Sequence, residues 1–279
     1  MEEVDKMSHR LRTCGAAAVL LLLLTLLSSC GQSAVQDETA TDYNQYIPSH
    51  GVTAYTKDLY IFFDSGRLFY VGRSQPSQLF PLCFQADCDH KNSSCTAWLN
   101  TPSRSIYAAG DNLYYIDADK DANPALYRMD LSGGGRELVK SLNILNEESW
   151  PGISSLGYSF RVYGSYLAIE LNLLNEDSWQ HKIYLTGIDG KDEGIFLFGE
   201  EDDSDKSYIA IEFRENWLFV TEKSAADGTN TLWGYNFSTQ EAVPLVEDWD
   251  ISNCFTVQDG ILYWAVTGDG VYSMDMEKK

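Results

Sequence analysis

The stretch from Gly110 to Leu138, GDNLYYIDADKDANPALYRMDLSGGGREL, decides the fold of this chain. It contains three short runs of strand-forming residues, and each run follows a turn: Leu113–Ile116, Leu126–Met129 and Glu137–Val139. Short runs separated by polar, acidic and glycine-rich turns are typical of antiparallel strands that follow one another along the chain. The stretch therefore predicts a three-stranded antiparallel meander.

The same order of runs and turns recurs on both sides of this stretch, as in DLYIFF with RLFYVG and in GILYWAV with GVYSMDMEK. The first runs begin at Leu59, Leu113, Leu167, Leu218 and Leu262, which are 54, 54, 51 and 44 residues apart. A repeat of this size made of strands is typical of a β-propeller, because each blade buries its faces against its neighbours. We therefore predict an all-β protein, a β-propeller of four-stranded antiparallel blades with about five units, in preference to a β-sandwich.

The last unit has three runs, Cys254–Val257, Leu262–Val266 and Val271–Met274, and the sequence ends where an outer fourth strand is expected. Residues near Tyr43 to Tyr55 would complete this blade if the chain closes as a five-bladed ring. Alternatively, the chain is a fragment of a longer propeller, which is the interpretation we favour.

The N-terminal region has the pattern of an export signal. An apolar run of 12 residues, Ala16–Leu27, follows basic residues and is too short to span a bilayer. The next residues, LSSCG at 27–31, resemble the lipobox of bacterial lipoproteins, in which the cysteine takes a diacylglyceryl group. We predict a lipoprotein signal peptide at 1–29 and lipid attachment to Cys30; the alternative is an ordinary secretory signal.

Two further segments follow the signal peptide. Residues 30–50 are polar and predict a flexible tether, whereas residues 51–279 have the length of one all-β domain. Two or three acyl chains anchor a protein stably to a membrane. The predicted location is therefore the extracytoplasmic face of the cell membrane.

The chain is strongly acidic, with 41 Asp and Glu against 20 Lys and Arg and a formal net charge of −21. Nucleic acids and anionic lipid surfaces are bound by clustered Lys and Arg, so this balance argues against both as partners. Cations and neutral ligands remain compatible with it, as does an unknown protein or glycan ligand. Solubility outside the cell would also explain the charge.

A C-x4-C-x-H-x4-C pattern, formed by Cys83, Cys88, His90 and Cys95, is the most distinctive motif. Three thiolates and one imidazole suit a tetrahedral zinc site. Cysteines of exported proteins also form disulfides, and Cys254 would bring the number available for pairing to four. Structural zinc and disulfides both remain open, and in either case we expect the motif to hold a polar loop against the outer edge of the first blade.

The lipobox, the repeats and this motif together resemble propeller-containing lipoproteins of Gram-positive gut bacteria. Those proteins are similar to a domain of unknown function related to low-density-lipoprotein-receptor-type propellers. The resemblance covers nearly the whole chain and implies a surface-anchored propeller with no established activity. This chain is short compared with those proteins.

Alternating oxygen ligands at Asp117, Asp119, Asp121 and Asn123 resemble the first half of a calcium loop. However, Ala122 stands where the turn glycine of such loops belongs, and no Glu closes the loop at its twelfth position. The sequence therefore favours an exposed acidic hairpin tip over a calcium site.

Two nine-residue segments are identical at seven positions: LNILNEESW at 142–150 and LNLLNEDSW at 171–179. Each places a tryptophan, Trp150 or Trp179, beside carboxylates in a segment that we expect to connect strands. An indole ring flanked by acids and amides could stack on a sugar. The alternative is that these tryptophans cap the hydrophobic core.

The sequence contains no G-x-S-x-G, H-E-x-x-H or G-x-x-x-x-G-K-[ST] motif, and Gly133–Gly135 has the position of a turn between strands. We therefore predict no catalytic residue. The sequence favours a lipid-anchored binding or scaffolding module at the cell surface. A glycan-active or other hydrolytic propeller enzyme that uses channel carboxylates is the alternative.

Overall fold

A computed structural model describes residues 53–100, 105–175, 178–188, 194–199, 205–249, 255–266 and 268–278. The chain divides into two units, Met1–Thr41 and Asp42–Lys279, and all described residues belong to the second. The predicted signal peptide, Cys30 and the tether at 30–50 lie outside the described residues. Within the described ranges, no helix has both the length and the apolar character needed to cross a membrane.

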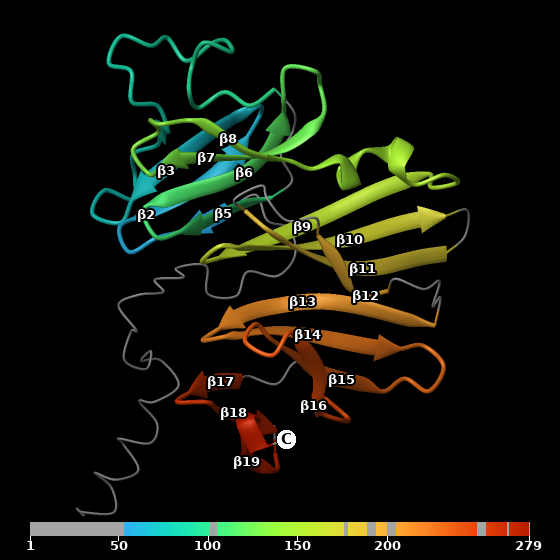
Figure 1. The fold of residues 1–279 in the computed structure, drawn as a ribbon. Helices are drawn as coiled ribbons and strands as arrows, with labels where there is room; N and C mark the ends of the chain where they lie inside the picture. Colours follow the sequence, from blue (N-terminus) through green and yellow to red (C-terminus); the bar gives the residue numbers. More distant parts are fainter. Residues whose placement is uncertain are drawn as a thin grey trace, which may run out of the picture. The chain divides into compact units, whose positions relative to one another are not determined.

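The described residues form five antiparallel sheets whose strands are neighbours in the order of the chain (Figure 1). The first sheet contains β1 (Thr53–Tyr55), β2 (Leu59–Asp64), β3 (Arg67–Gly72) and β4 (Phe80–Pro81). The second contains β5 (Ile106–Ala109), β6 (Asn112–Ala118), β7 (Pro124–Asp130) and β8 (Glu137–Ser141). The third contains β9 (Ser155–Tyr163), β10 (Tyr166–Asn175), β11 (Ser178–Gly187) and β12 (Ile195–Phe198).

The fourth sheet contains β13 (Lys206–Arg214), β14 (Trp217–Ser224), β15 (Asn230–Asn236) and β16 (Glu241–Val246). The fifth has three described strands: β17 (Phe255–Gln258), β18 (Ile261–Val266) and β19 (Gly270–Asp275). Three short 3₁₀ turns complete the described elements: η1 (Asn143–Leu145), η2 (Glu147–Ser149) and η3 (Met276–Lys278).

The predicted meander is confirmed as β6, β7 and β8, and the structure adds an inner strand, β5, in front of it. The segment of β5, IYAA, is short and rich in alanine, so its sequence carries little strand signal. Its strand conformation is stabilised by packing on both faces. Ile106 contributes to the core shared with the first sheet, and Tyr107 contributes to the core shared with the third.

Four hydrophobic cores each join one sheet to the next sheet in the chain. Representative pairs across the successive cores are Ile61 with Leu113, Ile116 with Leu167, Leu185 with Phe213, and Phe219 with Leu262. Within β6, Leu113 faces the first sheet while Ile116 faces the third, because neighbouring side chains of a strand point to opposite faces. The chain is therefore an all-β protein in which four-stranded sheets pack face to face as the blades of a β-propeller.

The fifth sheet differs from the other four in two respects. Only three of its strands lie in the described ranges, as the sequence predicted, and one of its faces leaves Tyr263 and Val271 exposed. The suggestion that residues up to Tyr55 complete this sheet is wrong for Thr53–Tyr55, because those residues form β1 and pair with β2 in the first sheet. The rest of that segment lies outside the described residues.

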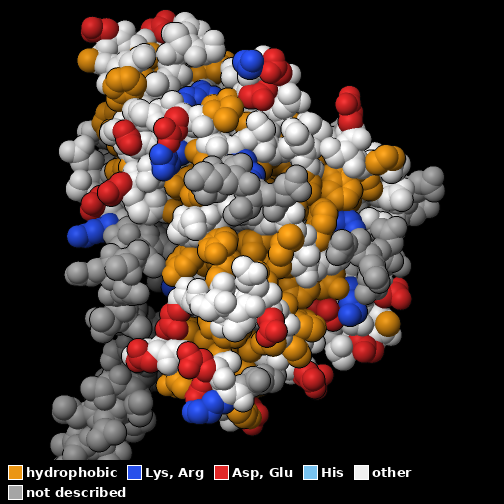
Figure 2. Space-filling view, in the orientation of Figure 1, with side chains coloured by type: hydrophobic (Ala, Val, Ile, Leu, Met, Phe, Trp, Pro, Cys, Tyr) orange, Lys and Arg blue, Asp and Glu red, His pale blue; other side chains and the backbone are white. Residues whose placement is uncertain are grey.

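The surface has the acidic character that the composition predicts. Acidic side chains are spread over the face of the molecule shown in Figure 2, while apolar side chains gather in its middle. This distribution agrees with the net charge of −21.

Candidate metal centre

The outer strand of the first sheet is built from two separate pieces of chain. Phe80 and Pro81 pair with one half of β3, and the N–H of Leu82 donates to the carbonyl of Leu68 over 2.9 Å. The other half is covered by Ala97–Leu99: the carbonyl of Ala97 accepts from Leu68 N–H over 2.8 Å. Residues 83–96 are therefore a loop inserted into one outer strand, and both ends of the loop are held by the same β3.

The four residues of the C-x4-C-x-H-x4-C motif converge in this loop. One ligand atom from each of Cys83, Cys88, His90 and Cys95 lies within 4.8 Å of all the others. His90 Nδ1 lies 3.4 Å from Cys95 Sγ, and the three cysteines carry free thiols. In a tetrahedral zinc site neighbouring ligand atoms are about 3.5–3.8 Å apart, so the separation of His90 from Cys95 matches this ion and the separations of the other ligand atoms exceed it by at most about 1 Å.

Turns in the loop backbone bring these ligands together. The Asn92 carbonyl accepts from Cys95 N–H over 3.1 Å, and the side chain of Asn92 accepts from Ser94 N–H over 3.0 Å. His90 adopts a left-handed conformation with a φ of 55°. Its carbonyl accepts a hydrogen bond from the Arg67 guanidinium over 3.2 Å, which fastens the ligand segment to β3.

The thiols of the cluster differ in acidity. Burial raises the pKa of Cys83, but hydrogen bonds from Thr96 and Gln85 outweigh this effect and lower the pKa to about 6. Burial, with the neighbouring thiols, raises the pKa of Cys95 to about 12. A bound Zn²⁺ would displace the proton of Cys95, because zinc binds the thiolate form of cysteine.

The glycine-rich turn of the second sheet lies directly against this loop. Gly133–Gly135 connects β7 and β8, as predicted for a turn between strands. Gly133 has a φ of +85°, and a Cβ atom at this position would lie 2.5 Å from the Leu82 carbonyl oxygen. A glycine is therefore required where the second sheet meets the residue that precedes Cys83.

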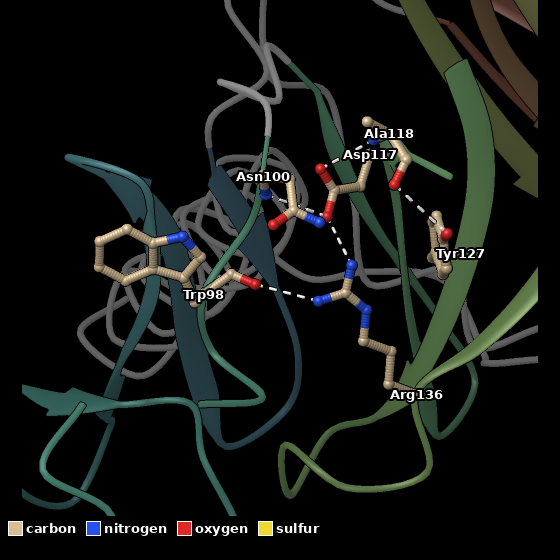
Figure 3. Close-up of polar contacts among 6 residues, drawn as sticks. All are labelled: Trp98, Asn100, Asp117, Ala118, Tyr127 and Arg136. Atoms are coloured by element: carbon tan, nitrogen blue, oxygen red, sulfur yellow. Dashed lines mark hydrogen bonds and ion pairs between the residues drawn. The ribbon is translucent and has the colours of Figure 1, made fainter. Parts of the chain in front are cut away.

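A buried ion pair lies next to the end of the loop (Figure 3). The Asp117 side chain on β6 is fully buried, and its carboxylate accepts from the Arg136 guanidinium and from the N–H groups of Asn100 and Ala118. Arg136 also donates to the Trp98 carbonyl over 3.0 Å. The pair therefore connects the second sheet to the chain segment that completes the first.

The contacts of Arg136 with Asp117 and with the Trp98 carbonyl could not be predicted from the sequence. Asp117 and the Trp98 carbonyl lie 19 and 38 positions away from Arg136 along the chain. A glycine-rich turn followed by an arginine gives no indication of either partner.

The residues of the possible calcium site have protein partners in the structure. Asp117 binds Arg136, and Asp119 accepts from the N–H groups of Asp121 and Asn123, both over 2.9 Å. Asp121 lies 3.6 Å from Lys120 Nζ. Within the described ranges, the converging groups of three or more potential metal ligands comprise the Cys and His cluster alone.

The two tryptophans of the repeated nine-residue segments have different environments. Trp150 is half-buried, donates from Nε1 to the Ile144 carbonyl over 2.8 Å and lies edge-on to Phe196. Trp179 is 50% exposed on β11. The expectation that both segments are connections is wrong for the second segment, because most of it forms the β10–β11 hairpin.

Comparisons with known proteins concern the fold alone. No model of a protein family matches the chain, and no curated protein matches it. An oligogalacturonate lyase in complex with manganese is 13% identical with a TM-score of 0.46; the match covers 79% of this chain and 60% of the lyase. TolB from Acinetobacter baumannii is 16% identical with a TM-score of 0.38, and 78% of this chain and 47% of TolB are covered.

The β-propeller domain of the Trilobed protease from Pyrococcus furiosus is 11% identical with a TM-score of 0.35; 80% of this chain and 81% of that domain are covered. The chain spans about 60% of the length of the oligogalacturonate lyases that it matches.

Proposed function

We propose that this protein is a lipid-anchored, extracytoplasmic β-propeller that acts as a binding or scaffolding module at the cell surface. The observation that supports a binding or scaffolding role over a catalytic one is the position of the Cys and His cluster. Its four ligands lie in a loop inserted into an outer strand, which is a position for reinforcing a blade. Catalytic zinc keeps one coordination position open for water, whereas four protein ligands close a structural site.

Zinc held by Cys83, Cys88, His90 and Cys95 would reinforce the first blade. The ion would supply the coordination bonds that tie the two ends of the loop together beside β3. A single disulfide would use two of the three thiols and leave the third thiol and His90 without a function. The convergence of all four side chains therefore favours zinc.

The anchor in this proposal is lipid on Cys30, and the partners are the membrane, through that lipid, and an unknown protein or glycan. The acidic surface disfavours nucleic acid, because phosphate groups require clustered basic side chains. Trp179 is the exposed candidate for stacking on a glycan, whereas Trp150 is packed against Phe196.

The anchor is tested by replacing Cys30 with Ala in the exporting bacterium. The Cys30→Ala protein should leave the membrane fraction and lose labelling by a fatty-acid probe, because the acylated sulfur is absent. Cys254→Ala is the matched control and should keep the label. Unchanged labelling of the Cys30→Ala protein would contradict the anchor.

A binding module and a hydrolase are distinguished by incubating the purified protein with a panel of insoluble polysaccharides. The measurements are the amount of protein retained on each polysaccharide and the amount of reducing sugar released from it. Retention without release supports a binding module. Release of sugar would instead support the hydrolytic alternative.

A further inference from the structure

The second sheet contacts both ends of the loop that carries the Cys and His cluster. Near the beginning of the loop, the Gly133 backbone lies against the Leu82 carbonyl. The next residue of the same turn, Gly134, lies next to the ring of Phe84, since a Cβ atom on it would be 3.5 Å from the ring atom Cγ. Leu82 and Phe84 stand on either side of Cys83. The turn between β7 and β8 therefore packs against the segment that carries the first ligand.

Near the end of the loop, the contacts with the second sheet are hydrogen bonds. Arg136 donates to the Trp98 carbonyl over 3.0 Å (Figure 3). The Trp98 N–H in turn donates to the Cys95 carbonyl over 3.0 Å, so Trp98 closes the turn that begins at the last ligand. Two residues later, Asn100 N–H donates to the Asp117 carboxylate over 3.2 Å. The buried ion pair of the second sheet therefore fixes the segment that follows the cluster.

The ligand atoms lie slightly farther apart than a bound zinc ion would hold them. They are within 4.8 Å of one another, whereas neighbouring ligand atoms of a tetrahedral zinc site are about 3.5–3.8 Å apart. Zinc binding would therefore draw the ligand atoms together by at most about 1 Å. Because Cys83 and Cys95 lie near the two ends of the loop, this movement acts on the carbonyls of Leu82 and Trp98. These are the two carbonyls that the second sheet contacts.

We propose that Arg136 is a positioning residue for zinc. It holds the end of the ligand loop from the neighbouring sheet, so that zinc binding and the packing of the second sheet on the first stabilise each other. This inference rests on the proposed zinc site and adds to it a residue from another sheet. Coupling free energies are reciprocal. The loss of the Arg136 contacts must therefore weaken zinc binding by the same factor by which zinc binding strengthens those contacts.

The competing explanation is that β3 alone holds the loop. Main-chain hydrogen bonds join the two, such as that from Leu68 N–H to the Ala97 carbonyl, and the Arg67 guanidinium donates to the His90 carbonyl. If these contacts suffice, removal of Arg136 lowers the stability of the protein and leaves its affinity for zinc unchanged. Affinity for zinc is therefore the measurement that separates the two explanations.

The probe is Zn²⁺, titrated into the purified metal-free protein in competition with a chelator that changes colour when it binds zinc. Arg136→Ala would leave Asp117 buried without its cation, so the test uses the double variant Asp117→Asn with Arg136→Met. This variant has no charge at either position and no donor for the Trp98 carbonyl. It should bind zinc about tenfold more weakly, the effect of losing one or two hydrogen bonds that support the bound loop.

Two further variants serve as controls. Arg136→Lys keeps a positive charge beside Asp117 but lacks the forked donors of the guanidinium, so it should recover part of the affinity for zinc. Arg128→Ala removes an exposed arginine of the same sheet and should keep the wild-type affinity. Thermal unfolding verifies that each variant is folded before its affinity is measured.

Hydrogen exchange tests the coupling in the unmodified protein. Removal of zinc with a chelator should accelerate exchange of the Asn100 and Gly133 N–H groups about tenfold, because the contacts between the loop and the second sheet loosen. The paired N–H groups of β14 and β15 in the fourth sheet should exchange at the same rate with and without zinc. If the double variant does not fold, this measurement decides.

Two results would overturn the inference. One is wild-type affinity for zinc in the folded double variant, and the other is unchanged exchange of Asn100 and Gly133 after zinc is removed. In both cases the wild-type protein still binds zinc, so the proposed zinc site would stand. Wild-type protein that cannot be loaded with zinc would overturn the inference together with that site. None of these outcomes bears on the Cys30 anchor or on polysaccharide retention.

Discussion

At the scale of single residues, Asp117 shows how this fold holds a charge in its interior. Its side chain is fully buried, whereas its partner Arg136 is partly exposed and lies over the rings of Tyr115 and Tyr127. The cost of removing a carboxylate from water is offset here by a guanidinium and two backbone donors. The ion pair therefore matters chiefly because its loss would leave a buried charge unpaired.

Replacing Arg136 with Ala should lower the free energy of unfolding by about 3–5 kcal/mol, because Asp117 would remain buried without its cation. Arg128→Ala is the matched control. Its partner Glu137 is about half exposed, so its removal should cost at most about 1 kcal/mol. Urea unfolding followed by tryptophan fluorescence measures both variants. Equal losses for the two variants would contradict a special role for the buried pair.

His90 decides between the two chemistries of the cysteine cluster. If the cluster holds zinc, the purified protein should carry about one equivalent of metal, and His90→Ala should lower this content because one of four ligands is lost. His181→Ala, at a histidine far from the motif in sequence, should leave the content unchanged. Metal content should also fall as the pH is lowered, since protons compete for the thiolates and the imidazole.

Two measurements together would contradict the zinc site. Protein without metal, and with a mass two hydrogens lighter for each pair of cysteines, would refute the zinc site and leave disulfides.

At the scale of structural elements, the β7–β8 turn shows how a neighbouring sheet restricts the residue type that a turn can contain. Gly133 approaches the Leu82 carbonyl so closely that a side chain has no room. The turn of the second sheet thereby supports the strand that leads into Cys83.

Gly133→Ala tests this contact against Gly66→Ala, which is a matched control. The two glycines have φ angles of +85° and +81°, so both substitutions introduce a similar backbone strain of about 1–2 kcal/mol. Only at Gly133 would the new Cβ meet another backbone, since nothing lies within 4 Å of a Cβ at Gly66. Gly133→Ala should therefore destabilise by roughly a further 1–3 kcal/mol in urea unfolding. Equal losses would show that the turn does not press on Leu82.

The two related nine-residue segments show that packing determines which secondary structure a segment adopts. LNILNEESW forms 3₁₀ turns after β8, whereas most of LNLLNEDSW forms the β10–β11 hairpin. In the second segment Leu171 and Leu173 are fully buried and pair with β9 and β11. Nearly the same sequence therefore adopts two conformations, because strand pairing depends on neighbouring strands and not on the segment alone.

At the scale of the whole molecule, each described hydrophobic core is shared by two consecutive sheets. A sheet that packs on both sides has apolar side chains on both faces, as in β6 and β10, where five consecutive residues are buried and four of the five in each strand are hydrophobic. The fifth sheet packs on the fourth through Leu262 and Trp264 and exposes Tyr263 on its other face. The stacking of consecutive sheets therefore explains the repeat in the sequence.

The sequence by itself determined the class of fold and the composition of the Cys and His cluster. The spacing of Leu59, Leu113, Leu167, Leu218 and Leu262 predicted five similar units, because strands and tight turns are encoded by neighbouring residues. The ligands from Cys83 to Cys95 are also close in the chain, so one loop can bring them together.

Only the tertiary structure decided which distant groups meet. It placed Arg136 between Asp117 and the Trp98 carbonyl, made β5 a strand, and divided the outer strand of the first sheet into two pieces. Each of these features depends on groups that lie far apart in sequence or on a neighbouring sheet. The free energy that stabilises these features comes from burial and hydrogen bonds that form only when the sheets pack together. No local pattern of residues therefore specifies them.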